Sequence, residues 1–213
     1  VSKIIVKNKK ASGVQLENGT TLEADLIISN ADLWFTETHL LEKRHQTYPE
    51  RYWEKAVLSP SAFIMYLGLD RELDILSHHN LRFGGDWKQN FKELFDTPQL
   101  PEDPSYYICK PTETDPDLSP QGTDNLFVLV PIPPGLTLSE EDMKSYRQKI
   151  LNLMKTDLNL PAIEDYIVYE RSYWSDDFQN DYNAYKGTAL GLAHTLKQTL
   201  NRPLNYSKKV KNL

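Results

Sequence analysis

Apolar and polar residues alternate through the first thirty positions of the chain, which is the period of half-buried β-strands. The pattern predicts strands at residues 4–6, 13–16 and 21–29. The pair Asn18-Gly19 lies between the second and third strands and is typical of a tight hairpin turn. These residues therefore predict a small β-meander. Its last strand is expected to be buried and to end at the polar stretch Ser29-Asn30-Ala31-Asp32.

The longest apolar run, residues 61–70, has apolar side chains on both alternations, which predicts a strand in the middle of a sheet and covered on both faces. Shorter strands are expected at residues 81–83, 106–110, 125–131 and 166–173. Helical spacing is found at residues 32–41, 48–55, 86–95, from Ser139 onward, and at 188–199. We therefore expect an α+β fold: a mixed, mainly antiparallel sheet with packed helices, together with the small β-meander.

Composition and charge exclude some classes of function. The 213 residues include 39% hydrophobic and 25% charged positions, which is typical of a globular chain. The net charge is -6 and the basic residues are scattered, so no nucleic-acid partner is expected. No run of about 18 apolar residues suits a membrane-spanning helix, and no secretory leader opens the chain.

The cysteine and the paired histidines do not by themselves predict a catalytic or metal site. The single Cys109 has no partner for an internal disulfide, which fits a reducing cytosolic compartment and an inert, semi-buried thiol. No Cys or His stands near it at metal-ligand spacing, so no metal site is predicted. The pair His78-His79 suits either a proton relay or, more ordinarily, one packed and one solvated imidazole.

Three segments bear on function, and each has an ordinary reading by itself. The stretch "ADLIISNADL" (24–33) suits a strand-to-helix turn in which Asn30 or Asp32 caps the helix. The stretch 115–133 suits a surface loop that leads into a buried strand. In the stretch 177–213, the tyrosines suit core aromatic residues and the glycines suit close helix packing.

Taken together and in order, these segments resemble the bacterial phytoene desaturase and diapophytoene (dehydrosqualene) desaturase family of FAD-dependent carotenoid desaturases. The resembling segments span nearly the whole chain: "GVQLENGTTLEADLIISNADL", "FIMYLGLD", "HHNLRF", "LPEDPSYYICKPTETDPDLSPQGTDNLFVLVPIP", "DYNAYKGTALGLAHTL" and "RPLNYSKKVKNL". Family members carry a G-x-G-x-x-G turn for the FAD pyrophosphate and a glycine-rich C-terminal segment. Neither occurs here, so we expect a piece of a longer protein that does not hold FAD by itself.

The resemblance implies a division of the chain and a set of site residues. Residues 1–33 are expected to be the meander and return strand of the FAD-binding domain, 34–203 the substrate-binding domain, and 204–213 the return toward the FAD-binding domain. The implied FAD-binding residues are Val1, Ser29, Asn30, Ala31 and Asp32. The implied substrate-binding residues are Tyr66, Tyr182, Tyr185, Gly187 and Gly191. No catalytic residue is assigned.

The activity implied by the family is removal of a hydride and a proton from a long isoprenoid, phytoene or diapophytoene, with FAD as the hydride acceptor. Such a substrate resides in the bilayer, so a peripheral, monotopic attachment to the membrane is expected. Candidate docking surfaces are the helix with Trp34-Phe35 and the face with Trp87, Phe91 and Phe95, although either set also suits core packing. Two other classes stay open: a related flavoprotein, such as a carotenoid isomerase, a carotenoid oxidase or a retinol-saturase-like protein, and a non-catalytic lipid-binding module.

Overall fold

The computed structural model describes residues 1–213 and divides them into two units. The first, called here the terminal unit, combines Val1–Ser59 with Asp176–Leu213. The second, the sheet unit, is Pro60–Ser175. Each unit is described by itself below. The predicted boundaries at residues 33 and 203 concern the roles of the segments in cofactor and substrate binding, and they stay a prediction.

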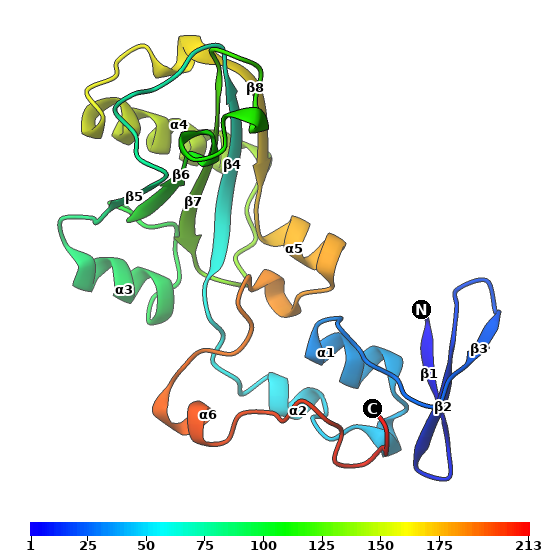
Figure 1. Ribbon diagram of the computed structural model, residues 1–213. Helices are drawn as coiled ribbons and strands as arrows, with labels where there is room; N and C mark the ends of the chain where they lie inside the picture. The colour runs from blue at the N-terminus through cyan, green and yellow to red at the C-terminus, as the bar shows by residue number, and fades with distance from the viewer. The chain divides into compact units, whose positions relative to one another are not determined.

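The terminal unit begins with the expected β-meander, β1 (Lys3–Lys7), β2 (Lys10–Gln15) and β3 (Thr21–Glu23), paired antiparallel in that order (Figure 1). Asn8 and Lys9 join the first two strands with φ of 51° and 60°, the left-handed backbone that a tight hairpin turn requires. Gly19 has φ 83°, and the Leu16 N–H donates to the Thr20 carbonyl at 2.8 Å across the second turn. The predicted meander is confirmed.

The expected continuation of the third strand to residue 29 is wrong. β3 ends at Glu23, and the side chains of Leu26 and Ile28 are 60% and 84% exposed. A strand needs a ladder of backbone partners. This stretch instead makes single bonds, from the Ala24 N–H to the Ser12 carbonyl at 3.2 Å and from the Ile27 N–H to the Asn212 carbonyl at 3.0 Å. Leu26 and Ile28 are therefore exposed on the surface of the terminal unit, while Ile27 packs against a small core cluster.

Short helices make up the rest of the terminal unit. They are α1 (Leu33–Phe35), a π-helical turn (Thr36–Leu40), α2 (Glu50–Trp53), α6 (Leu196–Leu200), 3-10 turns at Lys43–His45 and Tyr185–Gly187, and α5 (Ser175–Tyr182), whose first residue is the last of the sheet unit. The expected helices near residues 32–41 and 48–55 are present, the second one shorter than expected. The expected helix at 188–199 is wrong before residue 196. The Thr188 hydroxyl bonds the Ser59 carbonyl, and Gly191 adopts a non-helical φ of 72°.

The sheet unit is built on five strands in the order β5-β6-β7-β4-β8, and every neighbouring pair is antiparallel. Their bounds are β4 (Ser61–Leu69), β5 (His79–Arg82), β6 (Tyr106–Cys109), β7 (Asp124–Ile132) and β8 (Ile167–Tyr173). β4 lies between β7 and β8, as its apolar pattern predicted. With the helices below, this confirms the predicted α+β class.

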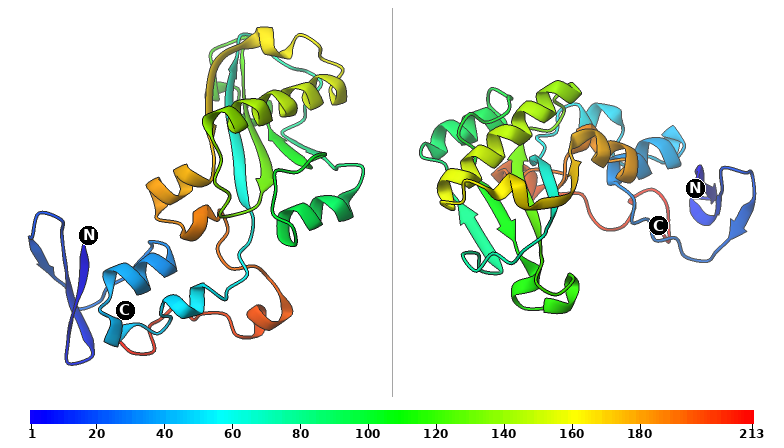
Figure 2. Two further views of the ribbon diagram at one scale, coloured as in Figure 1. Left: turned by 180° about the vertical axis from the view of Figure 1, so that it is seen from behind. Right: turned by 90° about the horizontal axis from the view of Figure 1, so that it is seen from above.

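One face of this sheet packs on α4 (Glu140–Asp157), which crosses the strands in Figure 2. Ser139 and Asp142 form a capping box at the start of α4: the Ser139 N–H donates to the Asp142 carboxylate at 2.8 Å, and the Asp142 N–H donates back to the Ser139 hydroxyl. The apolar side of α4 joins the strands in the main core, with these residues fully buried: Phe63, Met65, Val128, Val130, Ile150 and Met154. This packing leaves the other face of the sheet for different contacts.

The remaining helices of the sheet unit are α3 (Trp87–Phe95) and 3-10 turns at Pro111–Glu113, Pro116–Leu118 and Ile163–Tyr166. Asp86 caps α3 by accepting the Gln89 N–H at 3.0 Å. None of the helices in the chain combines the length and apolar character that crossing a membrane requires.

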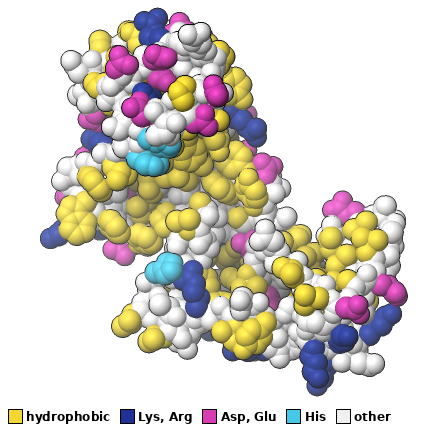
Figure 3. All heavy atoms as spheres, in the orientation of Figure 1, with side chains coloured by type: hydrophobic (Ala, Val, Ile, Leu, Met, Phe, Trp, Pro, Cys, Tyr) yellow, Lys and Arg dark blue, Asp and Glu magenta, His cyan; other side chains and the backbone are white.

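The sheet face opposite α4 carries a row of aromatic side chains, called here the aromatic face: His79, Tyr107, Phe127 and Tyr66. Register places Tyr66 directly opposite Phe127, with ring centroids 5.5 Å apart. Tyr107 lies 6.3 Å from Phe127 and 5.9 Å from His79. Tyr66 is 41% exposed, and Figure 3 shows hydrophobic side chains gathered over this part of the sheet unit, with histidine side chains at their border.

Candidate functional site

The turn that ends at Asp32 is held by the cap of α1. The Asp32 carboxylate accepts the backbone N–H of Trp34 at 2.8 Å and that of Phe35 at 3.4 Å. This is the N-cap role that the sequence predicted for Asp32. The hydroxyl of Ser29 lies 2.7 Å from that of Thr36, so both ends of the turn are tied to the same helical segment. The position of Asn30 and Ala31 between them is thereby fixed.

Burial has an electrostatic effect on Asp32. Desolvation raises the pKa of this carboxyl above its ordinary value of 3.8, while hydrogen bonds from the backbone of Phe35, Trp34 and Tyr185 act in the opposite direction. The backbone of Tyr185, more than 150 positions later in the chain, is therefore near enough to affect the pKa of this carboxyl.

The second segment, residues 182–191, is irregular backbone pinned by the buried Thr188. Its hydroxyl donates to the Ser59 carbonyl at 2.9 Å and accepts the Gly191 N–H at 3.1 Å, while the Gly191 carbonyl accepts the Ser59 N–H at 2.8 Å. A glycine suits position 191 because its φ is 72°. The sequence analysis did not identify Thr188, because its bonding partner Ser59 is distant in the chain and only the fold brings the two residues together.

These two segments border one cavity of about 580 Å³ within the terminal unit, a size typical of small-molecule sites. From the turn it takes Asn30, Ala31 and Asp32, and from the second segment Tyr182 and Gly191. The other lining residues are Phe178, Asp181, Asn183, Ala184, Thr188 and Ala189. We call this the tyrosine cavity. The structure therefore brings together three of the implied cofactor residues and two of the implied substrate residues.

A second and larger cavity of the same unit, about 810 Å³, also borders the turn. We call it the isoleucine cavity because Ile27 and Ile28 line it, together with Ser29, Ala31 and residues of the C-terminal segment. Ala31 lines both cavities, whereas Asn30 lines only the first and Ser29 only the second. A small side chain at position 31 thus separates two spaces that are each large enough for a ring or chain.

The other implied site residues lie elsewhere. Val1 is exposed at the start of the meander, and Tyr66 belongs to the aromatic face of the sheet unit. Tyr185 and Gly187 are buried and line neither cavity, and the Tyr185 ring packs 5.0 Å from Trp34. The binding roles of all these residues stay predictions.

Two substitutions at Asp32 distinguish the effect of its helix cap on stability from the effect of its charge. Asp32→Ala removes the cap and is expected to lower the free energy of unfolding by about 1 kcal/mol. The raised pKa means that the folded chain holds this proton more tightly than the unfolded chain, so the stabilising contribution is complete below 3.8 and is lost as the pH rises through the higher folded value. Asp32→Asn keeps a capping oxygen without this loss.

The unfolding free energies of the parent, Asp32→Ala and Asp32→Asn chains, measured in urea at acidic and at neutral pH, check this prediction. The Asn variant should gain stability relative to the parent as the pH rises. A difference between the two chains that does not change with pH would contradict the assigned cost of burying this charge.

Comparison with known proteins defines the family. The model described as flavin-containing amine oxidoreductase matches residues 1–213. The chain belongs to this family. It is 42% identical over 210 residues to a carotenoid 3,4-desaturase of Haloarcula japonica, and 38% identical over 218 residues to a zeta-carotene-forming phytoene desaturase of Myxococcus xanthus. It is also 32% identical over 217 residues to a 4,4'-diapophytoene desaturase of a Methylomonas species.

These matches cover 98%, 100% and 100% of this chain but only 42%, 41% and 42% of the relatives. The chain therefore spans about two fifths of the length of the curated relatives it matches. All three relatives are named as desaturases of carotenoids or their precursors, which agrees with the family that the sequence segments resembled.

Proposed function

We propose that this chain is part of an FAD-dependent carotenoid desaturase. Such an enzyme removes a hydride and a proton from neighbouring carbons of a long isoprenoid such as phytoene or diapophytoene. The observation that carries the proposal is the turn at Ala31, whose small side chain borders both the tyrosine cavity and the isoleucine cavity. A hydride passes only between atoms held about 3 to 3.5 Å apart, so a small residue suits a position between acceptor and donor.

The residues around the isoleucine cavity fit the ring end of a flavin. Apolar side chains of Leu26, Ile28 and Leu33 line it, and Ser29 and Asn205 add polar groups at its edge. The chain contains no glycine-rich phosphate turn, so these residues fit the ring and not the pyrophosphate. When bound, the flavin supplies a hydride acceptor. Ser29 and Ala31 line this cavity, and they stay proposed FAD contacts together with Val1, Asn30 and Asp32, which do not line it.

The residues of the tyrosine cavity suit an apolar chain next to the turn. Phe178 and Tyr182 pack with ring centroids 6.2 Å apart and present aromatic surface to the cavity. Such surface excludes water from the reacting carbons. In the sheet unit, the aromatic face with Tyr66 offers flat rings of the kind that a conjugated polyene packs against. Tyr182, Tyr185, Gly187 and Gly191 stay proposed substrate contacts, in part through the backbone.

Expression of a whole enzyme that carries this chain, in bacteria that make phytoene or diapophytoene, tests the proposed function. New conjugated double bonds, seen as a shift of the pigment spectrum to longer wavelength, are the expected result. Geometric isomers without new double bonds would identify an isomerase, oxygenated end groups an oxidase, and saturation of a retinol-type double bond a retinol-saturase-like enzyme. Binding of the isoprenoid with no product would identify a lipid-binding module.

We further propose a peripheral, cytoplasmic attachment to the membrane surface, because the substrate class dissolves in lipid and Cys109 is a free thiol. Of the two candidate surfaces, α3 supports docking better. Trp87 and Phe91 are 59% and 54% exposed, and their rings meet edge to face 5.9 Å apart. Trp34 and Phe35 instead pack against buried clusters of the terminal unit.

Charge on α3 should weaken membrane binding. Trp87→Glu together with Phe91→Glu replaces two apolar contacts by carboxylates and is expected to move most of the enzyme from liposome-bound to free fractions in flotation. The matched control is Leu118→Glu with Val168→Glu, which places the same charge on exposed apolar positions away from α3. Equal flotation of the α3 variant and the parent would contradict docking through this helix.

A further inference from the structure

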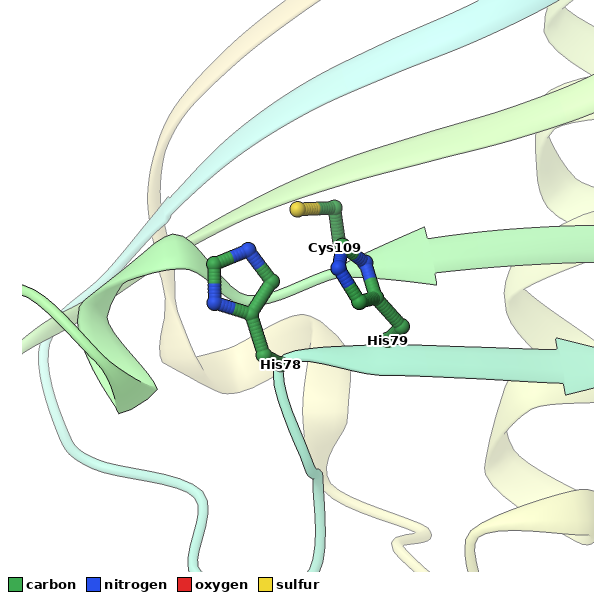
Figure 4. A group of neighbouring side chains, drawn as sticks. All are labelled: His78, His79 and Cys109. Carbon is green, nitrogen blue, oxygen red and sulfur yellow. The ribbon is translucent and has the colours of Figure 1, made fainter.

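The register of the sheet places a thiol and two imidazoles in one group at the border of the aromatic face. His79 of β5 pairs directly with Cys109 of β6, and His78 precedes β5 with its ring 4.2 Å from that of His79. One potential ligand atom from each of the three side chains lies within 4.8 Å of the others. Figure 4 shows both rings and the sulfur facing a common space.

Each imidazole in this group is oriented by a hydroxyl. The Nδ1 of His78 lies 2.7 Å from the hydroxyl oxygen of Thr114, and the Nδ1 of His79 lies 2.7 Å from that of Tyr107. Both Nδ1 atoms are therefore engaged, and Nε2 is the nitrogen left on each ring for another partner. A hydrogen bond to the second ring nitrogen is the usual way in which proteins orient a metal-binding histidine.

We propose that His78, His79 and Cys109 bind a zinc ion, with water as the fourth ligand. Two imidazole nitrogens and a thiolate are the donor set that Zn²⁺ prefers, and a tetrahedral ion brings its ligand atoms to about 3.5 Å from one another. The present separations are at most 4.8 Å, and small side-chain rotations can close the difference because His79 is exposed. Binding displaces the thiol proton of Cys109 to the solvent.

The ion would add a link between β5 and β6. β5 is an edge strand of four residues, and it pairs with β6 alone. A metal bound to both strands stabilises the folded state in proportion to the logarithm of its free concentration over its dissociation constant. Zinc binding should therefore raise the melting temperature of the protein, which Mg²⁺ should not do because it prefers oxygen ligands.

Titration of the protein with Co²⁺, a spectroscopic substitute for Zn²⁺, and with Zn²⁺ against a coloured chelator tests the proposal. We expect one equivalent, visible bands of tetrahedral Co²⁺, and a thiolate-to-cobalt charge-transfer band that Cys109→Ser removes. Loss of a group that only orients a metal-binding histidine typically weakens metal binding by roughly 10-fold. His78→Ala and His79→Ala each remove a ligand and should weaken Zn²⁺ binding by more than this. Thr114→Val should cost about 10-fold. The matched control is His194→Ala, an exposed histidine outside the group, which should change nothing.

Melting curves recorded without metal establish that each variant is folded, and Thr114→Val keeps all three ligands in place. Absence of the charge-transfer band in the parent protein would overturn the proposal. So would Zn²⁺ binding that Cys109→Ser and His79→Ala leave unchanged, because the ion would then be bound elsewhere.

Discussion

Replacement of Ala31 by tryptophan should abolish desaturation in a whole enzyme that carries this chain. Ala31 borders both cavities of the terminal unit, so an indole at this position would fill space on either side of the turn. Displacement of reacting groups by about 1 Å already costs on the order of 100-fold in rate. We therefore expect a loss of at least about 100-fold in product formed per enzyme, measured by chromatography of the extracted pigments.

The fold should survive this change because Ala31 is exposed. Circular dichroism and the melting temperature of the isolated chain should match those of the parent. Ala24→Trp is the matched control: it is an exposed alanine seven positions earlier, it borders neither cavity, and its variant should keep full activity. An Ala31→Trp enzyme with full activity would show that the turn lies away from the reacting carbons.

Local patterns predicted those elements whose cause is local. The pair Asn18-Gly19 favours a tight turn between two strands. Ser139 and Asp142 cap a helix through hydrogen bonds within four residues. The run from Ser61 to Leu69 is apolar on both alternations, and the structure pairs it on both sides. In the first two cases the determining contacts come from neighbours in the chain. β4 has the predicted central place in the sheet, but the expected cover on both faces is incomplete, because Tyr66 is 41% exposed.

Patterns failed where a distant partner decides the outcome. Ile28 looked buried, yet the structure pairs no strand beside it and leaves its side chain exposed. The residues after Thr188 have helical spacing but do not begin a helix there, because the Thr188 hydroxyl donates to the carbonyl of Ser59, more than 120 positions earlier. Cys109 has no histidine near it in sequence, but the β5–β6 register brings His79 directly opposite. No window of adjacent residues contains these pairings.

The candidate site shows the same division. The cap at Asp32 and the turn before it were predicted from sequence, and the structure confirms the cap. The meeting of this turn with Tyr182 and Gly191 was implied by family resemblance alone, because those positions are about 150 to 160 residues apart. The walls of the second cavity come from residues 26–48 and from residues 204–213, the segment that the resemblance alone implied to return toward the FAD-binding domain.

A buried polar network holds the loop that leads into β7, where the sequence suggested only a surface loop. The Asp124 carboxylate accepts the Leu73 N–H at 2.7 Å and the Thr112 hydroxyl, and it lies 3.8 Å from the Lys110 ammonium. Lys110 is itself buried and also bonds the Leu73 carbonyl at 3.0 Å and Glu113 at 2.6 Å. Two loops of the sheet unit are thus fastened to one carboxylate.

Asp124→Ala should lower the free energy of unfolding by about 3 kcal/mol, because it leaves the buried Leu73 N–H and Thr112 hydroxyl without an acceptor, while Glu113 stays 2.6 Å from the Lys110 ammonium. Urea denaturation measures this loss. Asp117→Ala, an exposed carboxylate of the same loop, is the control and should stay within about 0.5 kcal/mol of the parent. If Asp124→Ala is as stable as Asp117→Ala, the carboxylate is not what fastens these loops.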